Sequence, residues 1–417
     1  MRTMTLKRTH AWITACLLLL ALVGCSPLGG ASVTPTAVLP TATPTPTAED
    51  YATKIVQGMT LDDKLGQMVI MQFYEPTYTA AQQAMVKPHP GGVILYGYSM
   101  GTANQVKTLL ASGQKDSPIP MFTVLDLEGG LVDRLAQYLG TRMSAPDIAA
   151  SGNVDVARQQ GTKTGQDLLS FGFNTDLAPD VDVAIVNGPD QYGRTFGKTP
   201  EPVITYSGAW LDGLQRTGVI GAAKHFPGLG ASTVDAHKGL PVINRTKAQL
   251  DQVELAPYRA LIQSGQLQMV MTTDLLVPSV DPKMPAELSK PVVTGLLRDE
   301  LQFHGVIVTD ALYMDGISGT YTFTQAAVLA YEAGNDMIMA PWRPSMITSI
   351  VTAMKKELTA GRITQDQIDQ SVTRILALKI RMGILKADGY TPTFSNGIGA
   401  TSGTAGGTAS PTAAATP

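Results

Sequence analysis

The chain has 417 residues, and its 31 lysines and arginines almost balance its 34 aspartates and glutamates. This balance provides no electrostatic basis for nucleic-acid binding, so we expect no nucleic-acid partner. A hydrophobic content of 44% is ordinary for a globular protein, and the length allows one large domain or two of medium size.

The N-terminus has the features of a lipoprotein signal peptide, which is predicted over residues 1–24. Positive charges at Arg2, Lys7 and Arg8 precede an apolar run of 13 residues, which is too short to span a bilayer. The run ends in Leu-Val-Gly-Cys, which resembles the bacterial lipobox. We therefore expect Cys25 to be lipidated and to anchor the chain to the bacterial cell membrane, outside the cytoplasm. An ordinary signal peptide followed by an incidental cysteine is the alternative.

Low-complexity sequence is predicted on both sides of a central domain. Residues 25–48 are rich in threonine and proline, which favour an extended tether, and residues 389–417 have the Gly, Thr and Ala composition of a disordered tail. The globular domain is therefore expected over residues 49–388. Cys16 is removed with the signal peptide in this interpretation, so the mature chain has one cysteine and no internal disulfide.

The central domain alternates short apolar runs with segments of helical spacing. Eight runs are predicted as strands, over residues 65–73, 92–96, 120–125, 174–183, 219–225, 268–273, 305–309 and 336–340. Helices are predicted over residues 102–112, 154–171, 203–218, 247–265, 290–301, 324–333, 346–360 and 364–382.

This alternation indicates the α/β class, with a parallel sheet that is covered by helices on both faces. Eight such units in one domain fit a single (β/α)8 barrel of the TIM type. An open, doubly wound sheet is the alternative. The first predicted strand, however, lacks the glycine-rich phosphate loop that is typical of that fold.

Polar residues stand at the C-terminal ends of five predicted strands, where barrels of this type carry their chemistry. In chain order these are Asp126 and Glu128, then Asp176, Asp180 and Asp182, then Lys224 and His225, then Asp274, and finally Asp310. Because these strand ends meet at one face of a barrel, we expect the side chains to surround a common site.

Asp310 follows the apolar residues of the seventh predicted strand. A carboxylate at that edge can attack an anomeric carbon as a nucleophile. The alternative is an N-cap for the following turn, since aspartate is a favoured capping residue. The polar residues at the other strand ends favour the nucleophile.

Asp235 and His237 stand two residues apart in a loop rich in glycine and proline. If they share one face of the loop, the carboxylate can orient the imidazole, and the pair can act as general acid and then general base. The alternative is a structural Asp that bonds backbone amides beside a packed His. A metal site formed by His225, Asp235, His237 and Asp310 is a further alternative, but no H-x-H or H-E-x-x-H motif supports it, and we predict no metal and no cofactor.

Lys224 and His225 end a strand that is predicted to be buried on both faces, and a buried lysine needs a partner. They can donate to sugar hydroxyls, or Lys224 can form an internal ion pair with Asp126 or Asp182. Arg134 and Arg194 can likewise donate to a polar ligand or can be plain surface arginines.

These residues resemble the motifs of family 3 glycoside hydrolases, in the β-N-acetylglucosaminidase branch. The resemblance rests on Lys224-His-Phe-Pro-Gly-x-Gly with Asp235-x-His237, on Asp126-x-Glu-Gly-Gly with Arg134, on Arg194-Thr-Phe-Gly and on Val308-Thr-Asp310-Ala-Leu-x-Met. It covers essentially the whole globular region.

The resemblance implies a single barrel and a retaining mechanism. It assigns Asp310 as the nucleophile, His237 as the acid/base and Asp235 as its partner. It also implies that N-acetylglucosamine is bound by Asp126, Arg134, Arg194, Lys224 and His225. Relatives that act on glucosides often take their acid from a second domain, whereas this chain ends soon after the barrel, so a barrel loop is expected to supply it.

Three positions depart from the family pattern, which usually has His at Leu229, Ser at Ala236 and Arg at Leu131. None is a predicted catalytic residue, so the departures bear on substrate preference. The favoured hypothesis is a monomeric, membrane-tethered exo-β-N-acetylhexosaminidase that acts on cell-wall or chitin-type saccharides. A phosphorylase of the same family and a catalytically weak sugar-binding lipoprotein are the alternatives.

Overall fold

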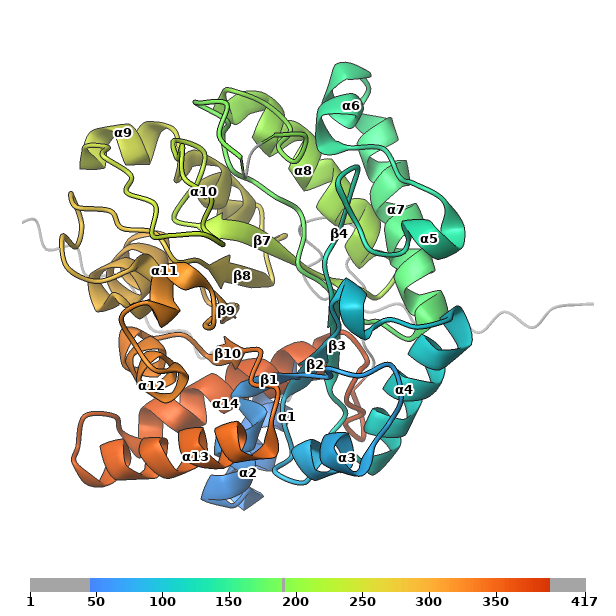
Figure 1. Ribbon diagram of the computed structural model, residues 1–417, viewed down its shortest axis with the longest axis vertical. Helices are drawn as coiled ribbons and strands as arrows, with labels where there is room; N and C mark the ends of the chain where they lie inside the picture. Colours follow the sequence, from blue (N-terminus) through green and yellow to red (C-terminus); the bar gives the residue numbers. More distant parts are fainter. Residues whose placement is uncertain (1–45, 190–191, 391–417) are drawn as a thin grey trace, which may run out of the picture. The chain divides into compact units, whose positions relative to one another are not determined.

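Eight parallel strands close into a barrel in the computed structural model, which describes residues 46–189 and 192–390 (Figure 1). Around the barrel the strands follow the order β1-β10-β9-β8-β7-β6-β3-β2. Their bounds are β1 Val69–Gln72, β2 Gly92–Ile94, β3 Phe122–Leu125, β6 Thr175–Asp176, β7 Ile220–Phe226, β8 Met269–Thr272, β9 Val306–Ala311 and β10 Met337–Met339. The predicted (β/α)8 barrel is therefore confirmed. The predicted signal peptide, Cys25, most of the tether and the tail from residue 391 lie outside the described residues.

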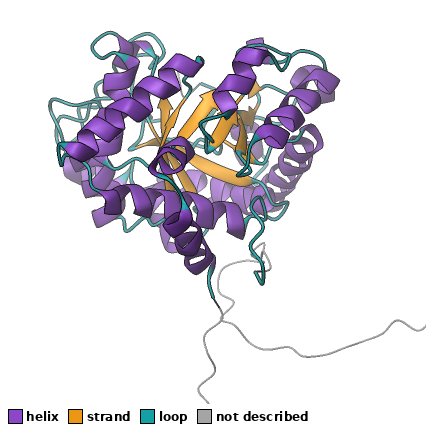
Figure 2. Cartoon of the chain, turned by 90° about the horizontal axis from the view of Figure 1, so that it is seen from below, coloured by secondary structure: helices purple, strands orange, loops and turns teal. Residues whose placement is uncertain are grey.

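Helices surround the barrel strands on the outside (Figure 2). The helices are α1 Ala48–Gly58, α2 Leu61–Gln67, α3 Ala80–Val86, α4 Ala103–Asp116, α5 Ala136–Leu139, α6 Ala145–Ala150, α7 Val154–Phe171, α8 Pro200–Gln215, α9 Lys247–Gln252, α10 Ala256–Gln263, α11 Asp315–Ser318, α12 Phe323–Ala333, α13 Pro344–Thr359 and α14 Gln365–Arg381. A hairpin of β4 (Leu127–Gly129) and β5 (Val132–Asp133) follows β3, two 3-10 turns cover Gly97–Ser99 and Ala286–Leu288, and a π-helix covers Pro291–Glu300. Within the described ranges, no helix combines the length and the hydrophobicity needed to cross a membrane.

Threonine side chains define where several helices begin. Thr47 caps α1, Thr102 caps α4 and Thr364 caps α14, each by accepting a hydrogen bond from the backbone N–H three residues later. In each case the side chain of that third residue accepts a hydrogen bond from the backbone N–H of the threonine, which completes a capping box. Helix α1 therefore begins at Ala48, the last residue of the predicted tether.

The first and fourth predicted strands are much shorter in the structure than in the prediction. Residues 65–67 of the first belong to α2, because a continuous apolar run is compatible with a buried helix as well as with a strand. The fourth, predicted over residues 174–183, pairs as a strand only at Thr175–Asp176. Beyond it, Asp180 forms an isolated bridge with Lys224 of β7. The predicted helix at 247–265 is divided into α9 and α10.

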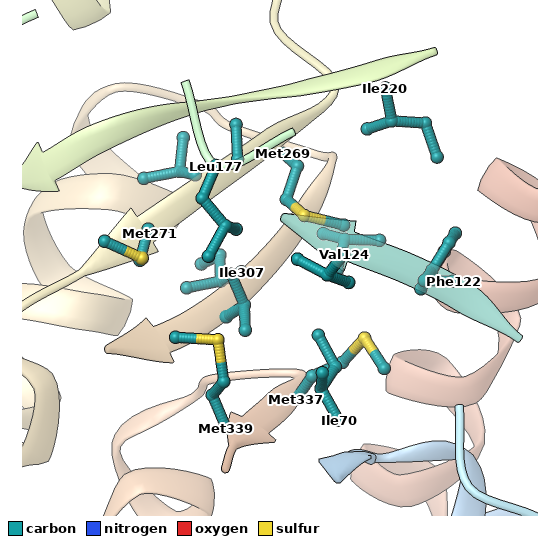
Figure 3. Close-up of a cluster of buried hydrophobic side chains, with 14 of the residues drawn as sticks. Ile70, Phe122, Val124, Leu177, Ile220, Met269, Met271, Ile307, Met337 and Met339 are labelled. Atoms are coloured by element: carbon teal, nitrogen blue, oxygen red, sulfur yellow. The ribbon is translucent and has the colours of Figure 1, made fainter. Parts of the chain in front are cut away.

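Apolar side chains from opposite strands fill the barrel interior (Figure 3). Alternate residues of one strand reach this core, as Phe122 and Val124 do on β3 and Met269 and Met271 do on β8. These side chains are at most 2% exposed, so the barrel is closed by packing. The polar residues that follow along each strand therefore lie at the carboxyl-end face.

A buried carboxylate joins the last part of the chain to the barrel. Asp336 directly precedes β10 and is fully buried. Its Oδ1 accepts hydrogen bonds from Arg374 at 2.7 Å and from Ser371 at 2.8 Å, both on α14. Its Oδ2 accepts from the Ile307 backbone N–H at 2.8 Å and from Arg298 of the π-helix. Burial raises the pKa of Asp336, but the charges of Arg298 and Arg374 outweigh it, so the pKa lies below its ordinary value.

Replacing Asp336 with Asn keeps the shape of the side chain and removes its charge. Arg298 and Arg374 then lose their buried carboxylate, so we expect the free energy of unfolding to fall by about 3–5 kcal/mol. Urea titration followed by circular dichroism measures this change. The control is Asp299→Asn, an exposed residue of the π-helix, with an expected change within about 0.5 kcal/mol. Equal effects of the two substitutions contradict the central role of Asp336.

Candidate active site

A cavity of about 390 Å³ opens at the carboxyl ends of the barrel strands. Every strand but β1 contributes to its lining, either directly or through the residues that follow it. The residues from the sequence prediction that line it are Asp126, Glu128, Arg134, Arg194, Lys224, His225, His237 and Asp310. The structure therefore brings the residues of five separate sequence motifs to one place.

Lys224 lies at the centre of a buried group of charges. Its Nζ lies 2.9 Å from Asp126 Oδ1 and 2.6 Å from Glu128 Oε1. Arg134 reaches the second oxygen of Asp126 at 3.1 Å, and Arg194 binds both oxygens of Glu128 at 2.7 and 2.9 Å. Of the two roles considered for Lys224, the internal ion pair is the one present, and its partners are Asp126 and Glu128 rather than Asp182. We define these five residues as the charged cluster.

The charged cluster keeps its members ionised although they are buried. Burial alone raises the pKa of Asp126 and Glu128 and lowers that of Lys224. The opposite charges nearby outweigh burial, so both carboxyl groups have pKa values well below the ordinary range and Lys224 has one well above it. The cluster therefore presents fixed hydrogen-bond donors and acceptors to any ligand in the cavity.

His225 connects the charged cluster to a pair of buried aspartates. Its Nδ1 lies 2.7 Å from Asp182 Oδ2, and its Nε2 lies 3.3 Å from Arg194 Nη2. Burial lowers the pKa of His225, but the charge of Asp182 outweighs it and the pKa lies above the ordinary value. Asp182 also accepts the Leu229 backbone N–H at 2.7 Å, and its own N–H donates to Asp180 Oδ1 at 2.9 Å.

Asp180, Asp182 and His225 are also the one group in the described ranges whose ligand atoms lie close enough together to hold a metal ion, within 4.8 Å of one another. Most of these atoms are already engaged by the protein, as described above for Asp182 and His225. The metal alternative drawn from the sequence combined His225 with Asp235, His237 and Asp310, and among the described residues that combination does not form such a group.

Asp310 lies in β9, on the wall of the cavity. Its Oδ2 accepts a hydrogen bond from Thr273 Oγ1 at 3.2 Å, and its Oδ1 accepts from the Ala311 backbone N–H at 2.7 Å. Both oxygens are thus oriented, one by the residue that follows β8 and the other by β9. Asp310 is within the strand rather than at the start of a helix, so the N-cap alternative does not describe it.

Two further carboxyl groups lie behind Asp310. Glu287 Oε2 accepts the Asp310 backbone N–H at 3.1 Å, and Thr273 Oγ1 lies 3.3 Å from Asp274 Oδ1. Glu287 and Asp274 are both fully buried. Burial, and then the charges of Asp274 and Asp310, raise the pKa of Glu287 well above its ordinary value. Sequence reasoning missed Glu287, because it lies in a 3-10 turn, apart from any strand end.

The loop after β7 places Asp235 beside His237. Asp235 Oδ1 accepts the His237 backbone N–H at 3.0 Å and lies 3.1 Å from its Nδ1, and Lys238 Nζ lies 3.1 Å from Asp235 Oδ2. The His237 side chain is 67% exposed, in contrast to His225. The loop depends on Gly230, since a Cβ there would lie 1.8 Å from the Val183 carbonyl oxygen.

The three departures from the family pattern have different surroundings. Leu229 and Ala236 are buried, at 1% and 2% exposure, so neither presents a large side chain to solvent. Leu131 lies between β4 and β5 and is 69% exposed. None of the three is part of the cavity wall.

A TIM-type barrel whose strand ends bring carboxylates, cations and imidazoles into one cavity has the architecture of a glycoside hydrolase. Comparisons with known proteins agree. The sequence-family model of the glycosyl hydrolase family 3 N-terminal domain matches residues 60–378. The chain therefore belongs to glycosyl hydrolase family 3.

Several relatives of the chain are named β-hexosaminidases. LpqI of Mycobacterium tuberculosis, a β-hexosaminidase, is 30% identical over 396 residues, which cover 90% of this chain and 98% of LpqI. β-Hexosaminidase A of Pseudoalteromonas piscicida is 30% identical over 320 residues, which are 70% of this chain and 53% of that protein, so the chain spans about half of its length. The structure of a family 3 β-N-acetylglucosaminidase from Paenibacillus sp. str. FPU-7 superposes with a TM-score of 0.74 at 34% identity, covering 82% of this chain and 66% of the other.

The raised pKa of Glu287 predicts a pH-dependent effect of Glu287→Gln. Above the ordinary pKa of a glutamate, Glu287 is ionised in the unfolded chain, whereas the folded protein keeps its proton. Folding therefore takes up a proton, and the stability contributed by this group falls as the pH rises. Glutamine does not titrate, so the Glu287→Gln variant lacks this loss of stability. The difference in the free energy of unfolding, variant minus wild type, should therefore increase by up to about 1.4 kcal/mol per pH unit above pH ~4.5.

Urea titrations at pH values between about 5 and 7.5 measure this difference. Glu201→Gln, at an exposed glutamate in the first turn of α8, is the matched control, and its pH profile is compared with that of Glu287→Gln. A constant difference for Glu287→Gln shows that Glu287 has an ordinary pKa in the folded protein.

Proposed function

We propose that this chain is a retaining exo-β-N-acetylhexosaminidase that releases terminal N-acetylglucosamine from cell-wall or chitin-type saccharides. The observation that supports the proposal is the single cavity in which Asp310 and His237 accompany the charged cluster. The β-hexosaminidases among its relatives support the choice of sugar. The cavity is bounded by buried ion pairs at the β3 and β7 side, which suits a terminal sugar rather than the interior of a chain.

In the first step, Asp310 attacks the anomeric carbon of the bound sugar. A bond forms between one Asp310 oxygen and that carbon as the glycosidic bond breaks, and the departing oxygen takes a proton from His237. Asp235 accepts a hydrogen bond from the ring and stabilises the protonated imidazole. Thr273 and the Ala311 N–H hold the carboxylate in place for the attack.

In the second step, water replaces the leaving group. His237, now neutral, takes a proton from the water as its oxygen bonds to the anomeric carbon, and the bond to Asp310 breaks. The two displacements together retain the anomeric configuration. Because His237 is largely exposed, the leaving group can depart beside it and water can take its place.

The charged cluster supplies the binding energy for the sugar in this proposal. Asp126 and Arg134 lie at its more exposed edge, where the Arg134 side chain is 30% exposed, and Lys224 lies beneath them at 2%. Hydroxyl groups of a sugar can donate to Asp126 and accept from Arg134, and the buried Lys224 keeps Asp126 ionised. His225 and Arg194 complete the proposed set of binding residues.

One observation favours a phosphorylase as the second candidate. The proposed acid/base is a histidine with Lys238 close to its Asp235 partner, and such a group does not repel phosphate as a carboxylate would. Assays with and without inorganic phosphate separate the two functions. Sugar phosphate as the main product, together with a faster rate, identifies the phosphorylase.

Substitutions at Asp310 and His237 test the mechanism. Asp310→Ala should lower kcat/KM for 4-nitrophenyl N-acetyl-β-glucosaminide by at least about 10³-fold, because the covalent route is lost. His237→Ala should lower kcat by about 10²–10⁴-fold with a sugar leaving group but much less with 4-nitrophenolate, which needs little protonation. His304→Ala, at an exposed histidine outside the cavity, is the control and should be unchanged. No hydrolysis of any β-hexosaminide by the folded wild type contradicts the proposal.

We further propose that residues 1–24 are a signal peptide, that Cys25 carries the lipid anchor, and that residues 25–48 tether the 49–388 domain outside the cytoplasm. The support is the order of charged, apolar and small residues before Cys25. Expression of the full chain in a bacterium should give activity in the membrane fraction. Cys25→Ala should move that activity away from the membrane, and an unchanged distribution contradicts the anchor.

A further inference from the structure

Strand β9 is irregular where it carries Asp310. On one side, its pairing with β8 ends one residue earlier, at Thr309. On the other side, β10 is matched by Val308 and then by Ala311, with a shift of register between the two. Irregularities of this kind change the direction of a side chain and are common next to active sites. The orientation of Asp310 therefore depends on more than the regular ladder of the barrel.

Two buried side chains bond the backbone of Asp310 at this irregularity. The Asp310 N–H donates to Glu287 Oε2 at 3.1 Å, and the Asp310 carbonyl oxygen accepts from Thr309 Oγ1 at 2.7 Å. Glu287 and Thr309 are both fully buried. Because these two bonds hold the peptide groups on either side of the Asp310 side chain, they fix the direction in which its carboxylate leaves the strand.

The turn that carries Glu287, Ala286–Leu288, is itself fixed from two sides. Its first N–H donates to the carbonyl oxygen of Leu275, which follows β8, at 2.7 Å. Asn335, which precedes β10, donates from Nδ2 to the Glu287 carbonyl oxygen at 2.8 Å. Asn335 Oδ1 in turn accepts from Thr272 of β8 at 2.9 Å. The carboxyl group of Glu287 is thus held behind β9 by contacts to both neighbouring strands.

The surroundings of the Glu287 carboxyl group favour its uncharged form. Its Oε1 has no hydrogen-bond partner among the described residues, and the titratable groups that act on it, Asp274 and Asp310, are both acidic. A buried carboxylate without a cation is costly. The charged and titratable groups of the adjacent α12 and π-helix are exposed or have other partners, namely Lys290 and Asp299 (exposed), Glu332 with Arg362, Arg298 with Asp336, Glu300 with Lys247, and Tyr331 with the Met68 carbonyl oxygen.

We propose that Glu287 is a positioning residue for Asp310, which holds the β9 backbone in the orientation that presents the Asp310 carboxylate to the anomeric carbon. This inference rests on the proposed function. Glu287 does not line the active-site cavity, so it acts through Asp310 and not on the sugar. It acts as the uncharged acid, whose carbonyl oxygen accepts the Asp310 N–H without adding charge behind the nucleophile.

The uncharged form of Glu287 has a measurable consequence for Asp310. Burial, and then the charges of Asp274 and Asp310, raise the pKa of Glu287 well above its ordinary value. Glu287 therefore keeps its proton while Asp310 loses its own, so Asp310 ionises beside a neutral group. An anion at residue 287 would oppose that ionisation and move it to higher pH, because like charges disfavour each other.

Two substitutions separate the hydrogen bond of Glu287 from its charge. Glu287→Gln keeps an oxygen that can accept the Asp310 N–H, whereas Glu287→Leu leaves that N–H without its partner. The substrate is 4-nitrophenyl N-acetyl-β-glucosaminide, at about pH 6. Glu287→Leu should lower kcat/KM by about tenfold or more, while the inhibition constant of N-acetylglucosamine stays within about twofold, since the binding residues are untouched. Glu287→Gln should keep about a third or more of the wild-type kcat/KM.

The pH profile of kcat/KM tests the charge of Glu287. With this substrate the leaving group needs little protonation, so the acid limb of the profile reports the ionisation of the nucleophile. The acid limb of Glu287→Gln should lie within about 0.3 pH unit of the wild type, because one uncharged group replaces another. A shift to lower pH by about one unit shows that Glu287 is ionised beside Asp310, and it overturns the inference.

Asp336→Asn is the matched control, because Asp336 is an equally buried carboxyl group that does not line the active-site cavity. It should lower the stability and leave kcat/KM unchanged. Circular dichroism establishes that each variant is folded. If Glu287→Leu does not fold, Glu287→Asp replaces it, since the shorter side chain withdraws the acceptor from the Asp310 N–H and should cause a similar loss.

The outcomes separate this inference from the proposed function. Wild-type kcat/KM in folded Glu287→Leu, or an equal loss in Glu287→Leu and Glu287→Gln, overturns the positioning role while the proposed function stands. Failure of the folded wild type to hydrolyse the substrate contradicts the proposed function instead.

Discussion

The ion pairs of Lys224 with Asp126 and Glu128 are the interaction on which the candidate site depends. Lys224 is 2% exposed, so its charge is stable only because two carboxylates lie within 2.9 Å. Those carboxylates come from the β3 end and the β4 hairpin, and they also hold Arg134 and Arg194. Removing the lysine therefore takes from both buried carboxylates the cation that they share. One side chain of β7 thus contacts both carboxylates, and each carboxylate also binds an arginine.

The site combines a rigid half with an exposed half. The charged cluster and Asp310 are positioned by strands whose other side chains fill the barrel core, so their geometry is tied to the stability of the whole domain. His237 lies on the loop after β7, and its side chain is 67% exposed. This division suits a reaction in which one sugar must be held throughout while a leaving group departs and water enters. The groups proposed to bind are therefore buried, and the group proposed to move protons is accessible.

The barrel was predictable because parallel strands buried on both faces leave an unbroken apolar signature between helices. The convergence of Asp126, Lys224 and Asp310 was predictable because parallel strands end at the same face. The choice among partners was not, since Asp126 and Asp182 were both candidates for Lys224 and the structure pairs it with Asp126 and Glu128. Asp126 and Lys224 are 98 residues apart, and their contact depends on the register of β3, β6 and β7, which no local pattern specifies. Glu287 left no signal at all, since it comes from a turn and reaches Asp310 through the backbone of β9.

Leu229 illustrates how the loop after β7 is held in place. The backbone N–H of Leu229 donates to Asp182 Oδ1 at 2.7 Å, whereas the Leu229 side chain is buried. Every amino acid except proline supplies that N–H. A change from an imidazole to an isobutyl group at residue 229 therefore does not detach the loop from Asp182. The loop is therefore attached to Asp182 through the backbone. The side chain at residue 229 can change during evolution while the loop keeps Asp235 and His237 in place.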